Sequence, residues 1–461
     1  MSARDTAKLT KRILFAYALP AFVVALPTIP IYINLPSYYG IELGLGLAAT
    51  GLILLLARIF DTVTDPLIGV LSDRLNFKGA RRKPWIAVGA VVAGVGLYKV
   101  LNPPADVDAS YLLGWCILLY GGWTMVAVPY FAWGAELSDD YDERTRITSW
   151  REAAGLLGIL GAGAVSTVAV NLGLGDGNPV ASIAWLAIAL GIVAFPILLR
   201  TVPDTMPAKH APAPVSFSKF KSEVRSLAAN TPFVRLLGAW FINGLANGIP
   251  SALFLIYLQY ALGAGEADQP LFILVYFLSG VLAIPLWLKV SQRYGKHRTW
   301  CVSMMFAVFA FAMVPFIPTG EILMFGIVCV ITGMALGADL SLPPAIQADV
   351  LDYDRWKHKR VRAGVQFAMC GMATKLALAV SVGIALPSLE GLGFTPEAPT
   401  PDGIWALIFL YGVVPIGIKV LAIAMVWNFP ITAAKHAIIR KRLQQRDATT
   451  DLQSDEVSKP L

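Results

Sequence analysis

The stretch AATGLILLLARIFDTVTDPLIGVLSDR, residues 48–74, combines a long apolar run with two acids. A helix needs about 20 apolar residues to cross the hydrocarbon core of a bilayer, and this run is long enough. Asp61 and Asp65 fall near its middle, four residues apart and therefore on one helix face. Ionised side chains at this depth are costly, and they mark ion or proton paths. The stretch predicts a membrane helix that carries a cation site.

The composition extends this prediction to the whole chain. Of the 461 residues, 56% are hydrophobic and only 15% are charged, whereas soluble proteins average about 25% charged residues. We predict an all-α membrane protein with twelve transmembrane helices. The spans are expected at roughly 13–38, 45–72, 83–101, 111–135, 150–171, 181–200, 233–262, 270–290, 299–318, 321–345, 363–386 and 403–429.

A polar, proline-rich stretch divides the spans into six and six. We expect a first six-helix bundle with the cation site at 1–200, a linker at 201–232, a second bundle at 233–430 and a tail at 431–461. Within the linker, helical spacing predicts a short amphipathic helix at the membrane surface, formed by Phe217, Phe220, Val224 and Leu227. The tail is polar towards its end, and we expect no regular structure there.

Basic residues concentrate in alternate loops, whereas the other loops carry mainly acids. The basic loops contain Arg74, Lys78, Arg81, Arg82, Lys83, Arg144, Arg146, Lys209, Lys219, Arg293, Lys296, Arg355 and Lys357. By the positive-inside rule, these loops and both termini are cytoplasmic, which predicts a multi-pass protein of the cell (inner) membrane. The net charge of +7 is then a topology signal and not a sign of nucleic-acid binding.

The two halves share a repeated pattern. PYFAWGAELSDDYDERTR (129–146) aligns with PPAIQADVLDYDRWKHKR (343–360), which places Glu136 on Asp349 and Asp139 on Asp352. LSDRLNFKGARRKPW (71–85) aligns with VSQRYGKHRTW (290–300). Two pseudo-symmetric six-helix halves are the architecture of the major facilitator superfamily, with substrate at the midplane. The second-half counterpart of the acid pair, FLSGVLAIPLW, has no acid, so the cation site is expected in the first half alone.

The run RIFDTVTDPLIGVLSDR followed by RRKPW resembles the signature of the glycoside–pentoside–hexuronide:cation symporters. The resemblance extends over PYFAWGAELSDDYDERTR, SWREAAGLLG and MATKLALAV. It implies cotransport of a solute with Na⁺, Li⁺ or H⁺ by alternating access, with no cofactor or metal beyond the coupling ion. It places cation ligands at Asp61, Asp65, Thr64 and Thr124, and functional cations at Arg151 and Lys375.

The chain departs from the family's best-known member at the sugar site. Two sugar-binding acids of that member fall at Ala25 and Ala127, and a lysine falls at Val24. A galactoside is therefore not the expected solute. We expect cation-coupled symport of another sugar, glycoside or uronate-like solute. The alternative is a lysolipid or another amphiphilic or anionic solute, because a eukaryotic branch that resembles this family moves lysolipids with Na⁺.

The residues expected to contact substrate are Tyr32, Trp123, Phe131, Arg151 and Lys375. Aromatic rings stack on sugars or on apolar substrate groups, although helix packing is the competing role for each. Arg151 has a second possible role as the ion-pair partner of Glu136. Lys375 either competes with the cation for the two acids, contacts substrate, or forms a fixed pair with Asp339.

The remaining charged residues are expected to form a gating network. Arg58 lies three residues before Asp61 and is expected to pair with an acid in one conformation. The other members are expected to form weak, breakable pairs that hold the cytoplasmic side closed: Asp73, Arg74, Arg81, Arg82, Glu136, Asp139 and Arg144.

The sequence argues against a membrane enzyme. The histidines His210, His297, His358 and His436 fall in the basic loops or the tail, and the four cysteines match no zinc pattern. We expect the partners to be a small or amphiphilic substrate, the coupling cation and membrane lipids, and the protein to act as a monomer without nucleic acid.

Overall fold

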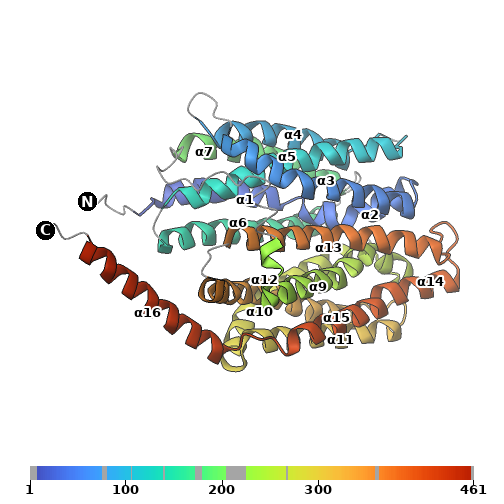
Figure 1. The fold of residues 1–461 in the computed structure, drawn as a ribbon. Helices are drawn as coiled ribbons and strands as arrows, with labels where there is room; N and C mark the ends of the chain where they lie inside the picture. Colours follow the sequence, from blue (N-terminus) through green and yellow to red (C-terminus); the bar gives the residue numbers. More distant parts are fainter. Residues whose placement is uncertain are drawn as a thin grey trace.

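The computed structural model describes residues 8–74, 80–104, 106–138, 141–171, 179–203, 225–265, 268–358 and 363–457. Its helices run between two ends of the molecule, and both chain termini lie near one of them, the terminal end (Figure 1). The first half contains α1 (Lys11–Ala25), α2 (Leu35–Ser37), α3 (Leu47–Arg74), α4 (Lys83–Leu101), α5 (Ala109–Glu136), α6 (Tyr141–Asn171) and α7 (Pro179–Thr201). The second half contains α9 (Thr231–Ile256), α10 (Asp268–Tyr294), α11 (Lys296–Met313), α12 (Ile322–His358), α13 (Ala363–Gly391), α14 (Pro401–Ile408) and α15 (Val414–Trp427), and α16 (Ala433–Val457) follows it.

The predicted spans fall on these helices. Among the described residues, 11 helices are long and apolar enough to cross a membrane, and they coincide with all predicted spans except the fifth. The fifth, 150–171, falls on α6, of which the side chains from 163 onward lie outside the described residues. The largest differences from the predicted spans are in α6, which begins at Tyr141, and in α12, which continues to His358.

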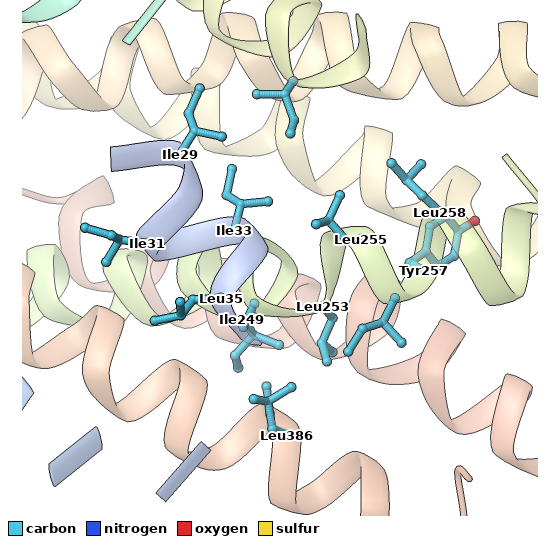
Figure 2. Close-up of a cluster of buried hydrophobic side chains, with 14 of the residues drawn as sticks. Ile29, Ile31, Ile33, Leu35, Ile249, Leu253, Leu255, Tyr257, Leu258 and Leu386 are labelled. Carbon is cyan, nitrogen blue, oxygen red and sulfur yellow. The ribbon is translucent and has the colours of Figure 1, made fainter. Parts of the chain in front are cut away.

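The first span is irregular because it is rich in proline. Proline lacks the amide hydrogen that a helix needs and clashes with the preceding turn. After α1, the chain forms π-helical stretches at Pro30–Asn34 and Tyr38–Glu42, with the short α2 between them. These wider turns place the segment from Ile29 to Leu35 against α9 of the other half (Figure 2).

The two halves share one apolar cluster, the seal, at the end opposite the termini. Figure 2 shows part of it, where Ile33 and Leu35 of the first half lie beside Leu255 and Ile249 of the second. The other two apolar clusters each belong to a single half. The halves are therefore joined through a common core at the opposite end, whereas at the terminal end each half has a core of its own.

Glycines let α3 and α13 approach closely beside the seal. A Cβ atom on Gly383 would lie 2.6 Å from the side chain of Leu55, and one on Gly51 would lie 3.0 Å from Leu386. At the same end, the carboxylate of Glu390 accepts a hydrogen bond from the amide of Ala48 at 2.7 Å. This bond links the end of α13 to the first turn of α3.

We expect Gly383→Leu to open the seal. Overpacking a tight contact costs about 1–3 kcal/mol, which changes a conformational equilibrium by roughly five- to a hundredfold. A cysteine at Leu253, which is fully buried, would report the change as faster labelling by a membrane-impermeant maleimide. Gly371→Leu is the matched control. Gly371 lies on the same helix as Gly383, but a Cβ atom added to it would meet nothing within 4 Å. Equal labelling of the two variants would show that this contact does not hold the seal closed.

The expectation that the end of the tail has no regular structure is wrong as far as residue 457, because α16 runs from Ala433 to Val457. His436 lies 2.9 Å from the carboxylate of Asp352, and Ile439 and Leu443 are buried. The guanidinium of Arg446 donates a hydrogen bond to the carbonyl of Arg355 at 3.3 Å. The sequence looked polar because only a narrow face of α16 packs against α12. Of the predicted linker helix, Phe217, Phe220 and Val224 lie outside the described residues, and Leu227 is buried in the second half.

Candidate functional site

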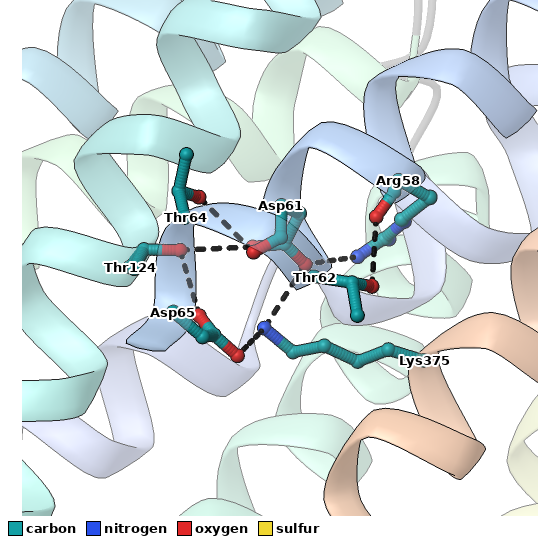
Figure 3. Close-up of polar contacts among 7 residues, drawn as sticks. All are labelled: Arg58, Asp61, Thr62, Thr64, Asp65, Thr124 and Lys375. Carbon is teal, nitrogen blue, oxygen red and sulfur yellow. Dashed lines mark hydrogen bonds and ion pairs between the residues drawn. The ribbon is translucent and has the colours of Figure 1, made fainter. Parts of the chain in front are cut away.

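Helix α3 presents Asp61 and Asp65 on one face, and two other helices complete the site (Figure 3). The ammonium nitrogen of Lys375, from α13, lies 3.0 Å from Oδ2 of Asp61 and 2.7 Å from Oδ2 of Asp65. The hydroxyl oxygen of Thr124, from α5, lies 2.9 Å from Oδ1 of Asp61 and 3.0 Å from Oδ1 of Asp65. The two carboxylates are therefore bridged on one side by a hydroxyl and on the other by an ammonium group.

The ammonium bridge crosses the boundary between the halves. Lys375 belongs to the second half and both acids belong to the first, so each ion pair ties α13 to α3. The Asp61 side chain is 3% exposed, whereas those of Asp65 and Lys375 are 24% and 29% exposed. Asp61 is thus the inner acid, and the outer acid and the lysine face a more open space. The alternative pairing of Lys375 with Asp339 is not what the structure shows.

Arg58 completes the charge balance. Its guanidinium lies 3.7 Å from Oδ2 of Asp61, as the sequence predicted, and 4.1 Å from the ring centroids of both Tyr32 and Tyr120. A cation held between two aromatic faces is stabilised by their negative faces, most strongly where water is excluded. With two acids and two cations, the site is neutral when all four groups are charged.

Thr64 is in the site, but its hydroxyl is engaged elsewhere. It donates a hydrogen bond to the backbone carbonyl of Asp61 at 3.0 Å, and not to a carboxylate. Threonine hydroxyls within helices commonly bond to the carbonyl three or four residues earlier. The neighbouring Thr62 bonds in the same way to the carbonyl of Arg58 at 2.9 Å. Thr124 is therefore the hydroxyl that touches both acids.

Tyr32 belongs to the cation site and not to a separate substrate wall. With Arg58, Tyr120 and residues of α13, it lines a cavity of about 20 Å³ between the halves. Tyr120 was not among the predicted site residues. It lies one helical turn before Thr124 on the same face of α5, so helical spacing from Thr124 was the signal that could have found it.

A second polar group lies nearer the terminal end. Phe131 is two helical turns beyond Thr124 on α5, about 10 Å along the same face, and it is 52% exposed. The guanidinium of Arg151 lies 4.4 Å from the Phe131 ring centroid, and it pairs with Glu152 at 2.5 Å. The alternative pairing of Arg151 with Glu136 is not what the structure shows. Phe131 is therefore accessible on the first half, whereas the paired Arg151 beside it is mostly covered, with 17% of its side chain exposed.

Trp123 does not join either group. It lines a different, almost wholly apolar hollow of about 640 Å³ between α1, α4, α5 and α7. Because successive helix residues are turned by about 100°, Trp123 points in a different direction from Thr124, towards the hollow. The structure therefore does not place this ring beside the other predicted substrate residues.

The predicted gating residues that the structure describes pair within one half. At the terminal end, Glu136 lies 2.5 Å from a nitrogen of Arg81 and 2.7 Å from one of Arg82. The equivalent pair of the second half joins Lys296 to Asp349 at 2.6 Å, as the internal repeat predicts. These bonds tie the start of the third span to the end of the fourth in each half. The side chains of Asp73, Arg74, Asp139 and Arg144 lie outside the described residues.

We expect Glu136→Gln to destabilise the protein in a pH-dependent way. Burial raises the pKa of Glu136, but the hydrogen bonds and charges of Arg82 and Arg81 outweigh it, so the pKa lies below its usual value. A lowered carboxyl pKa stabilises the fold above the unfolded pKa, and this stabilisation is lost as the pH falls through the folded pKa. The variant should lose about 1–3 kcal/mol at pH 7. In melting curves recorded in detergent, the difference in melting temperature between the variant and wild type should shrink below about pH 4.5. A difference in melting temperature that stays constant down to pH 3 would contradict the ion-pair explanation.

The second half holds a buried polar network that the sequence did not predict. Lys419, which is 1% exposed, donates hydrogen bonds to Asn243 at 2.9 Å and Asn247 at 2.8 Å. The amide nitrogen of Asn247 donates to Asp339 at 2.8 Å, and the indole of Trp300 donates to the same carboxylate at 2.6 Å. An amide thus bridges the lysine and the acid, which explains how both are accommodated inside the bundle.

Comparisons with known proteins agree with this architecture. The symporter YjmB of Bacillus subtilis, named as uncharacterized, is 26% identical and covers 90% of this chain and 91% of its own. The isoprimeverose transporter of Lactiplantibacillus pentosus is 23% identical over 90% of this chain and 87% of its own. The human sodium-dependent lysophosphatidylcholine symporter 1 is 25% identical over 86% of this chain and 79% of its own.

Solved structures share the fold. The D-xylose-proton symporter superposes with a TM-score of 0.65 at 15% identity, covering 91% of this chain and 98% of its own. The nucleoside transporter NupG superposes with the same TM-score of 0.65 at 14% identity, covering 90% and 98%. The model of the family described as MFS/sugar transport protein matches residues 14–433. The chain therefore belongs to this family of major facilitators, the glycoside–pentoside–hexuronide:cation symporter type.

Proposed function

We propose that the protein couples the movement of Na⁺ or H⁺ to that of a sugar, glycoside or uronate-like solute by alternating access. The observation that carries the proposal is the position of the Lys375 ammonium group between Asp61 and Asp65. Two carboxylates about 3 Å from one point form a site for a small hard cation, with the Thr124 hydroxyl as a further oxygen ligand. The lysine and a cation would compete for this place.

This competition supplies a coupling mechanism. While Lys375 neutralises the acids, it also ties the two halves together through α3 and α13. A bound cation would neutralise the acids without crossing to the second half, so it would free α13 to move. Coupling requires that the cation bind the two conformations unequally, and the lysine bridge provides that difference. Arg58 would remain with Asp61 because its two aromatic partners belong to the first half.

The exposed ring of Phe131, with Arg151 beside it, is the best candidate for solute contact. Phe131 lies on the face of α5 that carries Thr124, and the Arg151 guanidinium would bind a carboxylate or phosphate group of a solute in exchange for its pairing with Glu152. By the positive-inside rule, we assign the terminal end to the cytoplasmic side of the membrane. The joined seal at the opposite end then corresponds to a conformation closed to the outside.

A lysolipid or other amphiphile is the second candidate. It is favoured by the apolar Ala25 and Ala127, which stand where the family's best-known member has acids. One relative is named as a lysophosphatidylcholine symporter. An anionic or zwitterionic head group near Arg151 would suit either class of solute, so only binding experiments separate them.

The test is a thermal-shift screen of the purified protein, with and without Na⁺ and at two pH values. The panel contains neutral sugars, glycosides, uronates and lysophospholipids. We expect one class to raise the melting temperature, and Na⁺ or acid pH to enlarge that shift. In a second step, uptake of this solute into proteoliposomes is measured, and we expect uptake only when an inward Na⁺ or proton gradient is imposed. Uptake that is indifferent to both gradients would contradict coupling, and stabilisation by lysolipids alone would replace the sugar assignment.

A further inference from the structure

The apolar hollow that includes Trp123, here called the lipid groove, lies on the outer side of the first half. Its walls are α4 and α7, with α1 and α5 as the floor. Figure 1 shows α4 and α7 at the edge of the molecule that faces away from the second half. Val91 of α4 and Ile192 of α7 line the groove and are 66% and 70% exposed. In a bilayer these helices face the hydrocarbon.

The groove has the length of one lipid leaflet. Its lining on α4 extends from Ala87 to Tyr98, which is about 16 Å at 1.5 Å per residue. The hydrocarbon core of a bilayer is about 30 Å thick, so one leaflet provides about 15 Å of tail. The rings of Tyr98 and Trp185 meet edge to face at 5.1 Å where the lining of α4 ends. The volume of about 640 Å³ also lies within the usual range of ligand pockets.

Two basic residues lie just beyond the groove, on the side nearer the terminal end. Lys83 is one helical turn before Ala87 on α4, and Arg200 is one turn after Pro196 on α7, so each extends a lining stripe. The ammonium of Lys83 lies 5.6 Å from the ring centroid of Trp133, whose indole donates to the carbonyl of Pro203 just beyond α7. Both charges therefore sit where a head group would lie if its tail filled the groove.

We propose that the lipid groove is a binding site for an anionic phospholipid of the leaflet at the terminal end. One acyl chain fills the groove, and Lys83 and Arg200 hold the phosphate. Juxtamembrane cations attract anionic head groups, and an apolar wall without polar partners selects hydrocarbon over water. The inference depends on the membrane-spanning fold and the two cations, and not on the proposed transport.

Glycines supply a sharp test of the occupant. Gly94 lines the groove, and a Cβ added to it meets nothing within 4 Å, so Gly94→Phe fills the groove without disturbing the helix packing. Gly417→Phe is the matched control, because Gly417 on α15 is equally open and lies in the other half. A different variant tests the charges: the double substitution Lys83→Gln and Arg200→Gln removes both cations and leaves the groove open. Melting temperatures identify any variant that fails to fold.

The measurement is native mass spectrometry of each protein released from equimolar phosphatidylglycerol and phosphatidylcholine. We expect wild type and Gly417→Phe to retain phosphatidylglycerol in preference, and Gly94→Phe to retain at least about tenfold less. The double variant, which lacks both cations, should show a preference for phosphatidylglycerol lower by about 25-fold, or about fivefold for each cation removed. Unchanged retention in Gly94→Phe would overturn the site. Equal retention of the two lipids by wild type would show that the groove holds bulk lipid and would overturn the anionic assignment.

Discussion

Asp61→Asn is expected to lower the cation affinity by at least about a hundredfold and to abolish cation-driven uptake. Asp61 is the inner acid, with 3% of its side chain exposed, and it is approached by Lys375, Arg58 and Thr124 at once. Removing one partner of a buried ion pair costs about 3–5 kcal/mol, and each 1.4 kcal/mol is a tenfold change in an equilibrium constant. Asparagine keeps the size and the hydrogen-bonding oxygen, so the variant removes mainly the charge.

The measurement is the rise in melting temperature during a Na⁺ titration, repeated as a proton titration. Asp402→Asn is the control, because Asp402 is an exposed acid in the first turn of α14. Asp65→Asn should behave like Asp61→Asn, with a smaller loss because its side chain is 24% exposed. If Asp61→Asn retains wild-type dependence on the coupling ion, then the acid pair is not the coupling site. Facilitated diffusion would then describe the transport.

Lys375→Met is expected to separate cation binding from transport. Without the ammonium group, the two adjacent carboxylates lose their competitor, and their mutual repulsion favours a bound cation or proton. We expect the half-saturating cation concentration to fall by about tenfold or more. In the absence of the cation, the melting temperature should fall, because an uncompensated buried charge costs about 3–5 kcal/mol. Added cation should restore it.

Uptake by Lys375→Met should nevertheless be lost, since the switch between the lysine bridge and the cation no longer exists. The control is Lys289→Met, which removes an exposed lysine from α10. Cation affinity and uptake measured on the same preparation distinguish this result from simple misfolding. A variant whose cation affinity equals that of wild type would show that Lys375 does not occupy the cation's place.

Local rules were sufficient for much of the site. The four-residue spacing of Asp61 and Asp65 required that they share a face of α3, and the spacing of Arg58 required that it lie nearby. The repeat correctly matched the Arg81–Glu136 pair to the Lys296–Asp349 pair. The partners of Lys375 were left open in the sequence, because contacts between distant helices depend on how the halves pack.

The residues that were missed or misplaced share one property. Tyr120, Glu152 and Asn247 acquire their roles from neighbours on other turns or helices, as Tyr120 does from Arg58. Trp123 looked like a cavity residue because aromatic rings suit solute contact, but its direction on α5 turns it towards α1, α4 and α7. The tail looked irregular because its packing face is narrow, and only contact with α12 selects the helix.

The sequence by itself determined the spans, their division into halves and the presence of an acid pair at membrane depth. These follow from hydrophobic run length and helical period, which are properties of short segments. Only the tertiary structure decided that Lys375 bridges the acids, that the seal lies at the end opposite the termini, and that a groove opens between α4 and α7. Each of these depends on which helix faces which, and that is set by the packing of side chains far apart in the chain.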